Sequence, residues 1–117
     1  MYKHANLTVM VSDMKRALAF YAETLGLERG RAYGDEWAEI NAPGMTIGLH
    51  PGGKRPLAEH SRHYSVGLQV DDLDDAMRKL SAKGIAFTPA PSDKGLRLAY
   101  FTDPDGNPLY LCEVKWG

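Results

Sequence analysis

The chain repeats itself at an offset of 59 residues, and this repeat constrains the fold more than any other feature. The segment from His4 to Asp13 aligns without a gap with the segment from His63 to Asp72. The alignment continues through the apolar positions that follow each segment. Because both halves show the same order of predicted elements, we interpret the chain as two tandem copies of one module.

Each half is predicted as a strand, a helix and three further strands, which defines an α+β fold of two βαβββ modules. Apolar and polar residues alternate in the first strand of each half, and an aspartate follows that can cap a helix. The turn signals Ala42-Pro-Gly44 and Asp103-Pro-Asp-Gly106 separate the last two strands of each half. The predicted strands cover residues 5–11, 31–34, 37–41, 45–50, 64–70, 86–88, 97–102 and 108–114, and the helices begin near 12–13 and 71–72 and end at Gly26 and Gly84.

The 117 residues form one domain of two modules, 1–50 and 63–117, joined by a linker at 51–62 that is rich in turn formers and charge. A half of this size has a marginal core, so we expect the two modules to fold together. One face of each sheet is covered by its own helix, and the other face needs a second sheet from the same chain or from another copy. We therefore predict a homodimer.

Charge and composition exclude several classes of function. The net charge of −1, from 14 basic and 15 acidic residues, disfavours nucleic-acid binding and a polybasic membrane contact. The sequence shows no apolar run long enough to span a membrane and no signal-peptide pattern. The single cysteine excludes an intrachain disulfide, and we expect a cytoplasmic protein.

The faces of the two leading strands that point away from the helices are unusually polar. These faces carry Asn6, Thr8, Met10, Ser65, Gly67 and Gln69. Because buried polar groups must find hydrogen-bond partners, so polar a face is not expected in a core. We expect the two sheets to form a concave cleft that is open to water.

The residues that carry the motifs resemble the vicinal oxygen chelate superfamily. The motifs are Val-Ser-Asp-Met-Lys-Arg-Ala-Leu-Ala-Phe-Tyr from residue 11, Val-Asp-Asp-Leu-Asp-Asp-Ala from residue 70 and Asp-Pro-Asp-Gly-Asn from residue 103. That superfamily includes glyoxalase I, extradiol dioxygenases, fosfomycin-resistance enzymes and bleomycin-resistance proteins. The resemblance implies paired βαβββ modules around a cleft, commonly in a homodimer, and in the enzymes a divalent metal that polarises substrate oxygens.

The positions at which the resemblance places metal ligands hold unsuitable residues. They correspond to Asn6 and Ser65 on the leading strands and to Gly48 and Tyr110 on the last strands. None of these residues supplies a carboxylate or an imidazole, the usual ligands of zinc, nickel, manganese or iron. We therefore expect the usual metal site to be absent and no cofactor to be bound.

A shifted metal site is the alternative. His4, His63, His50 and Cys112 lie two residues from the four positions above, on the same strand faces. Three imidazoles and a thiol are competent metal ligands. The segment His63-Tyr-Ser-Val-Gly is also similar to a His-Tyr-x-x-Gly segment of fosfomycin-resistance enzymes, and this match would imply that His63 is a metal ligand.

Aromatic residues supply the remaining candidates for the cleft. Trp37, Tyr100 and Tyr110 can stack on a planar ligand, and Glu39 is a carboxylate within a predicted strand whose faces the sequence does not assign. We assign no catalytic residue. The sequence predicts binding or sequestration of a small organic molecule. The alternatives are a metal-dependent glyoxalase, dioxygenase or thiol transferase, and an interaction or regulatory module.

Overall fold

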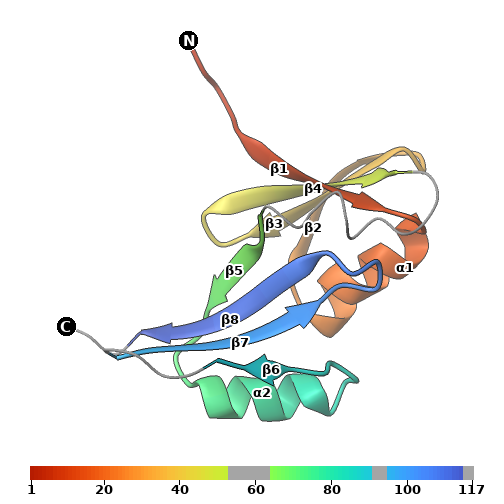
Figure 1. The fold of residues 1–117 in the computed structure, drawn as a ribbon. Helices are drawn as coiled ribbons and strands as arrows, with labels where there is room; N and C mark the ends of the chain where they lie inside the picture. The colour runs from red at the N-terminus through yellow and green to blue at the C-terminus, as the bar shows by residue number, and fades with distance from the viewer. Residues whose placement is uncertain (53–63, 91–94, 115–117) are drawn as a thin grey trace.

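The computed structural model describes residues 1–52, 64–90 and 95–114, and these residues form two βαβββ modules of mixed sheet and short helix. Figure 1 shows the two sheets with α1 beside the first and α2 beneath the second. The elements are β1 (Asn6–Val11), α1 (Met14–Leu18), η1 (Ala19–Thr24), β2 (Glu28–Tyr33), β3 (Trp37–Ala42), β4 (Met45–Pro51), β5 (Val66–Gln69), α2 (Leu73–Ser81), β6 (Thr88–Pro89), β7 (Leu96–Thr102) and β8 (Pro108–Val114).

The two sheets have the same topology, as the repeat predicts. Sheet A has the strand order β1-β4-β3-β2 and sheet B the order β5-β8-β7-β6. In each sheet the leading strand is parallel to the last strand, and the other pairs are antiparallel. Thr8 pairs with Gly48 in sheet A, and Gly67 pairs with Tyr110 at the equivalent position in sheet B. The α+β class and the tandem modules are therefore confirmed.

The helices begin where the sequence predicts. The side chain of Asp13 accepts a hydrogen bond from the backbone N–H of Arg16, and Asp72 caps α2 in the same way through Asp75. The first helix differs from the prediction after Leu18, because residues 19–24 form the wider π-helical turn η1. This turn places Tyr21, which is fully buried, toward the second module.

The core lies between each sheet and its helix and continues from one module to the other. Val9, Val11 and Ile47 are buried on the helix side of sheet A, and Leu109 and Leu111 on that of sheet B. Phe20 on η1 joins the two, with its ring centroid 6.4 Å from that of Phe101 on β7. Since a half of this size is marginal by itself, this shared contact lets both modules contribute to one core.

The edge strands are the elements that the sequence places least well. The strand expected at 31–34 is β2 over 28–33, and the strand expected at 86–88 is the two-residue β6. All six residues of β2 are exposed, and its pairing with β3 shifts between Arg29 and Ala32. A strand with no buried face has no period-2 pattern to locate it. The linker from residue 53 lies outside the described residues.

No helix in the described parts of the chain is long and apolar enough to cross a membrane. The first five residues are exposed and extend away from sheet A (Figure 1).

Candidate functional site: the open faces of the two sheets

The face of sheet A that points away from α1 is polar and exposed. Asn6 and Thr8 on β1 are exposed, while the alternate residues Val9 and Val11 are buried. The register places Glu39 of β3 beside Gly48 of β4 on this same face. The faces predicted for the leading strand are confirmed, and the structure decides the face of Glu39, which the sequence does not.

Trp37 covers the centre of the open face of sheet A. A Cβ atom placed on Gly48 would lie 2.0 Å from the Trp37 Cη2 atom, so the indole ring rests directly on the glycine backbone. The indole Nε1 donates a hydrogen bond of 3.0 Å to Glu39 Oε2. Gly48 is buried because of this ring, and Trp37 itself remains half-buried. Because Gly48 has no side chain, the flat Trp37 ring packs directly on the backbone, and the ring itself stays partly accessible to solvent.

Sheet B repeats this arrangement with a tyrosine. A Cβ atom on Gly67 of β5 would lie 2.2 Å from the Tyr110 Cζ atom, so the phenol ring lies over that glycine. Tyr100 packs edge-on against Tyr110, with ring centroids 6.3 Å apart. Cys112 follows on the same strand face, and partial burial raises the pKa of its thiol, which disfavours the reactive thiolate. Each sheet thus presents an aromatic ring on its open face.

The structure brings some of the candidate residues together and keeps others apart. Thr8 and Ser65 line one small cavity where β1 adjoins the start of β5. Neither Trp37 nor Tyr110 belongs to the lining of that cavity. Within one chain, the Trp37 ring lies on sheet A and the Tyr110 ring on sheet B.

The metal positions implied by the resemblance do not fit a divalent cation. Asn6 and Ser65 are exposed neutral side chains, Tyr110 is turned over Gly67, and the Gly48 position has no donor and is covered by an indole. Carboxylate and imidazole, the donors that such cations require, are missing from this set. The described residues also contain no group of three His, Cys, Asp or Glu side chains that could hold a metal.

The shifted set of candidate ligands is dispersed or undescribed. His4 is exposed in the segment before β1, and the Nδ1 atom of His50 lies 2.8 Å from the carbonyl oxygen of Pro51. Cys112 lies on sheet B, and His63 lies outside the described residues. The described members of the set therefore provide no assembled site.

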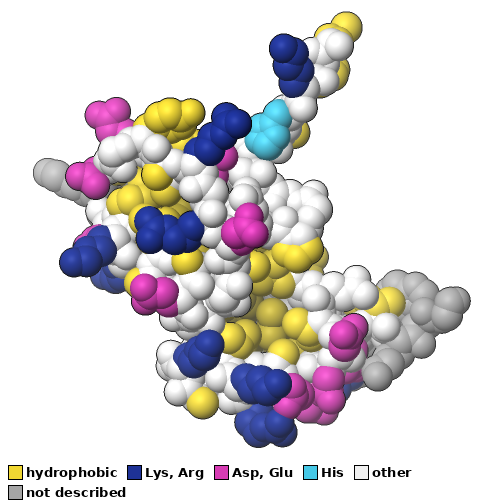
Figure 2. Space-filling model, turned by 180° about the vertical axis from the view of Figure 1, so that it is seen from behind, with side chains coloured by type: hydrophobic (Ala, Val, Ile, Leu, Met, Phe, Trp, Pro, Cys, Tyr) yellow, Lys and Arg dark blue, Asp and Glu magenta, His cyan; other side chains and the backbone are white. Residues whose placement is uncertain are grey.

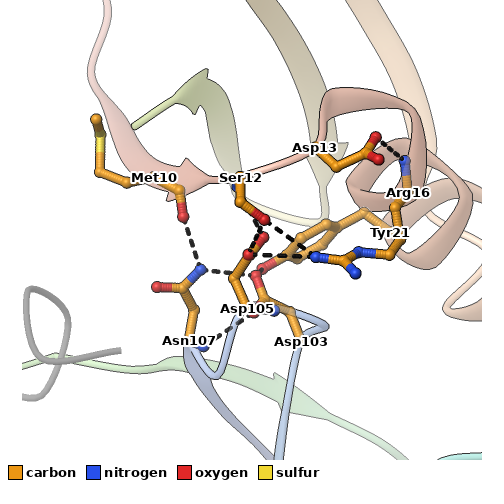
Figure 3. Close-up of polar contacts among 8 residues, drawn as sticks. All are labelled: Met10, Ser12, Asp13, Arg16, Tyr21, Asp103, Asp105 and Asn107. Atoms are coloured by element: carbon orange, nitrogen blue, oxygen red, sulfur yellow. Dashed lines mark hydrogen bonds and ion pairs between the residues drawn. The ribbon is translucent and has the colours of Figure 1, made fainter. Parts of the chain in front are cut away.

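A buried polar network fixes the two modules to each other (Figure 3). The turn after β7 places Asp105 against the end of β1, where it accepts hydrogen bonds from the backbone and hydroxyl of Ser12 and lies 3.5 Å from the Arg16 guanidinium. Asn107 donates from Nδ2 to the carbonyl oxygen of Met10 over 2.9 Å. These contacts hold the ends of the strands that carry both open faces in a fixed relation.

Tyr21 and Asp103 form the most buried part of this network. The phenol donates to Asp103 Oδ2 over 2.9 Å, and Asp103 also accepts two backbone N–H bonds within its own turn. Burial raises the pKa of the Asp103 carboxyl, and its hydrogen bonds oppose that shift. Burial and the adjacent carboxylate also raise the pKa of Tyr21. The sequence predicts the turn at residues 103–106 but not its contact with Tyr21. The one hint in the sequence is that the turn carries two aspartates, more than its backbone conformation needs.

Glu113 has a structural role on the buried face of β8. Its Oε1 atom accepts the backbone N–H of Leu73, the first residue of α2, over 2.9 Å. Arg97 forms ion pairs with both Glu113 and Asp74, which lies on the first turn of that helix. A carboxylate at a helix N-terminus satisfies a free N–H and complements the helix dipole. Glu113 therefore anchors α2 to sheet B.

A second hollow lies between the modules on the side seen in Figure 2, where apolar side chains gather. Leu25 and Leu27 at the end of the first helix face Leu68 on β5 and Leu80 on α2 across this hollow. Small-molecule sites combine apolar walls with a few polar groups that fix the orientation of the ligand. The lining here is mainly aliphatic, so the open sheet faces, which carry both aromatic and polar groups, are the stronger candidate.

Comparison with known proteins places this architecture in a family. The model of the Glyoxalase/Bleomycin resistance protein/Dioxygenase superfamily matches residues 3–111. The chain belongs to that superfamily.

Three relatives illustrate the range of the family. TnmS3, an antibiotic binding protein from Streptomyces sp. CB03234, is 27% identical, with a TM-score of 0.74 and coverage of 98% of both chains. Glutathione transferase FosA from Serratia marcescens is 26% identical over 91% of this chain and 77% of its own. The fosfomycin resistance protein FosX from Listeria monocytogenes shares the fold at a TM-score of 0.79 and 18% identity, covering 98% of this chain and 92% of its own.

Proposed function

We propose that this protein binds and sequesters a small organic molecule with a planar part, on the open faces of its sheets and without the metal of the family's enzymes. The observation that carries the proposal is the pair of aromatic rings seated on glycines, Trp37 on Gly48 and Tyr110 on Gly67. A flat ring held against the sheet offers its other side to a ligand at little cost in side-chain entropy. The similarity to TnmS3, described as an antibiotic binding protein, supports this choice within the superfamily.

A homodimer is part of the proposal. The open faces of both sheets carry exposed residues, among them Tyr100 and Gln69, and no described segment covers them. A second copy that places its sheet opposite would enclose a ligand between a polar face and an aromatic face. A sedimentation mass of two chains at micromolar concentration is expected. A mass of one chain there, with ligand present, would contradict this part of the proposal.

The proposal excludes a catalytic step through a protein-bound metal, because the donor set at the implied positions lacks carboxylate and imidazole. Elemental analysis of gently purified protein tests this point. We expect less than stoichiometric metal and a melting temperature that chelation does not change. Binding of one divalent ion per chain, with a melting temperature that falls on chelation, would favour the metalloenzyme alternative and direct mutagenesis to His4, His50, His63 and Cys112.

Tryptophan fluorescence tests the binding site directly. The chain has two tryptophans, and the Trp116→Phe variant leaves Trp37 as the single indole reporter. A panel of planar heteroaromatic compounds is titrated against this variant, and hits are confirmed by calorimetry on the wild-type protein. We expect quenching of Trp37 by at least one compound, with Tyr110→Ala weakening its binding. Failure of every compound to bind at millimolar concentration would refute the proposal.

A further inference from the structure

Glu39 lies on the open face of sheet A, at the edge of the Trp37 ring. It lies on β3 between two glycines of the neighbouring strands, Gly48 on β4 and Gly30 on β2. A Cβ atom built on Gly30 would lie 3.2 Å from the Glu39 Cβ atom. The Trp37 ring covers Gly48 and the Asn41 amide lies against Gly30, so the Glu39 side chain sits between these two groups and is half-buried.

Trp37 holds the Glu39 carboxylate at the edge of its own ring. The indole Nε1 donates to Oε2 over 3.0 Å, which orients the carboxylate and leaves Oε1 for another donor. Within residues 1–52, 64–90 and 95–114, no Lys, Arg or His side chain forms an ion pair with Glu39. The buried carboxylates of Asp105 and Glu113 each have an arginine partner. Glu39 is therefore a half-buried carboxylate that has a hydrogen bond from Trp37 and no ion-pair partner among the described residues.

The hollow beside Glu39 is lined by hydrogen-bonding groups and by basic side chains. Asn41 and Thr46 line the same hollow, which has a volume of about 760 Å³. Lys3, His4 and Arg31 also line it, and all three are exposed. Exposed charges are screened strongly by water and salt, whereas a half-buried carboxylate is screened less. Glu39 is therefore the half-buried acid of a hollow whose basic residues are exposed.

We propose that the planar ligand of this protein carries a positive charge, and that Glu39 and the face of Trp37 recognise that charge together. This inference rests on the proposed function and names the class of ligand as an organic cation, either a protonated amine or a quaternary heteroaromatic nitrogen. A cation above an indole is attracted by the negative face of the ring. A carboxylate fixed at the edge of that ring adds a charge-assisted contact in the same place.

Three probes of similar shape and different charge test the inference: 1-methylquinolinium (cation), 4-methylquinoline at pH 8 (neutral) and quinoline-4-carboxylate (anion). We expect the wild-type protein to bind the cation about tenfold more tightly than the neutral probe, since a cation–π contact and a half-buried ion pair together correspond to roughly that factor. The preference should shrink as NaCl is raised, while the affinity for the neutral probe stays constant.

The decisive variant is Glu39→Gln, because the amide oxygen of glutamine still accepts the Trp37 N–H while the charge is lost. We expect this variant to keep the Trp37 emission spectrum and lose the preference for the cation. Glu23→Gln is the matched control, since Glu23 is exposed on η1, and removal of its charge should leave the preference intact.

The outcomes separate the two proposals. Equal binding of the three probes to the wild-type protein, or an unchanged preference in Glu39→Gln, overturns the cation inference and leaves the planar-ligand function standing. Tighter binding of the anionic probe overturns it in favour of recognition by Lys3 and Arg31. Failure of all three probes to bind overturns the proposed function and the inference together.

Discussion

The substitution Tyr21→Phe removes one hydrogen bond from the contact between the modules and changes little else. Tyr21 has 0% exposure, and its hydroxyl donates to Asp103, which is 3% exposed, over 2.9 Å. Phenylalanine fills nearly the same volume, so the substitution creates almost no cavity. The variant therefore measures the contribution of this one contact to the free energy of unfolding.

The expected cost follows from the environment of Asp103. A hydrogen bond to a charged group contributes about 1.5–3 kcal/mol net. Asp103 keeps its bonds from the backbones of Asp105 and Asn107 and from the Asn107 side chain, so it remains partly satisfied, and we expect about 2 kcal/mol. With an unfolding entropy of about 2.1 cal/mol/K per residue for a chain of 117 residues, this corresponds to a fall in Tm of about 8 °C.

Urea unfolding followed by circular dichroism measures the loss, and a double-mutant cycle with Asp103→Asn assigns it to the pair. Tyr33→Phe is the control, because Tyr33 is 62% exposed and its substitution should change the stability by less than about 0.5 kcal/mol. A loss below that value for Tyr21→Phe would refute the reasoning. Strict additivity of Tyr21→Phe and Asp103→Asn would refute it equally.

Three further predictions concern the same structure. Burial raises the pKa of Tyr21 above its ordinary 10.0, so above pH 10 the folded state keeps a proton that the unfolded state loses. The free energy of unfolding should therefore fall above pH 10 by up to about 1.4 kcal/mol per pH unit. Urea unfolding between pH 9 and 11 should show a smaller dependence of this free energy on pH for Tyr21→Phe than for the wild-type protein. Gly48→Ala should displace the Trp37 ring, shift its emission to the red and cost about 1–3 kcal/mol, and an unchanged spectrum would contradict the seat on Gly48. Glu113→Gln keeps an acceptor for the first N–H of α2 but loses the charge, so we expect a loss of about 0.5–1 kcal/mol by urea unfolding, and a stability equal to wild type would contradict the anchoring role.

The contact between the modules bears on function through geometry. Asp105 and Asn107 attach the turn before β8 to the end of β1, and these two strands carry Tyr110 and Thr8. A weakened contact would let the two sheets move relative to each other. The Tyr21→Phe variant should therefore also weaken the binding of a ligand that touches both sheets, while a ligand confined to sheet A should be unaffected.

The pattern of apolar and polar residues along the sequence predicted those strands and helices that bury one apolar face. The alternation in β1 and β5 assigned their buried and open faces correctly, and the aspartates at 13 and 72 marked the helix starts. The same logic failed for β2, since an edge strand exposed on both faces has no alternation to read. It also did not predict the π-helical turn η1 at residues 19–24.

Some features of the candidate site could likewise be predicted from the sequence, and others could not. The sequence by itself established the repeat and the polar faces that carry Asn6, Thr8 and Ser65, because residue identity and period 2 are sufficient for these. Together with the family resemblance, it also showed that the implied metal positions lack a carboxylate and an imidazole. Only the tertiary structure showed that Trp37 lies on Gly48, that Tyr110 lies on Gly67 and that Glu39 is left without an ion-pair partner among the described residues. These facts depend on which strands are neighbours and in what register, and that is decided by packing between residues distant in the chain.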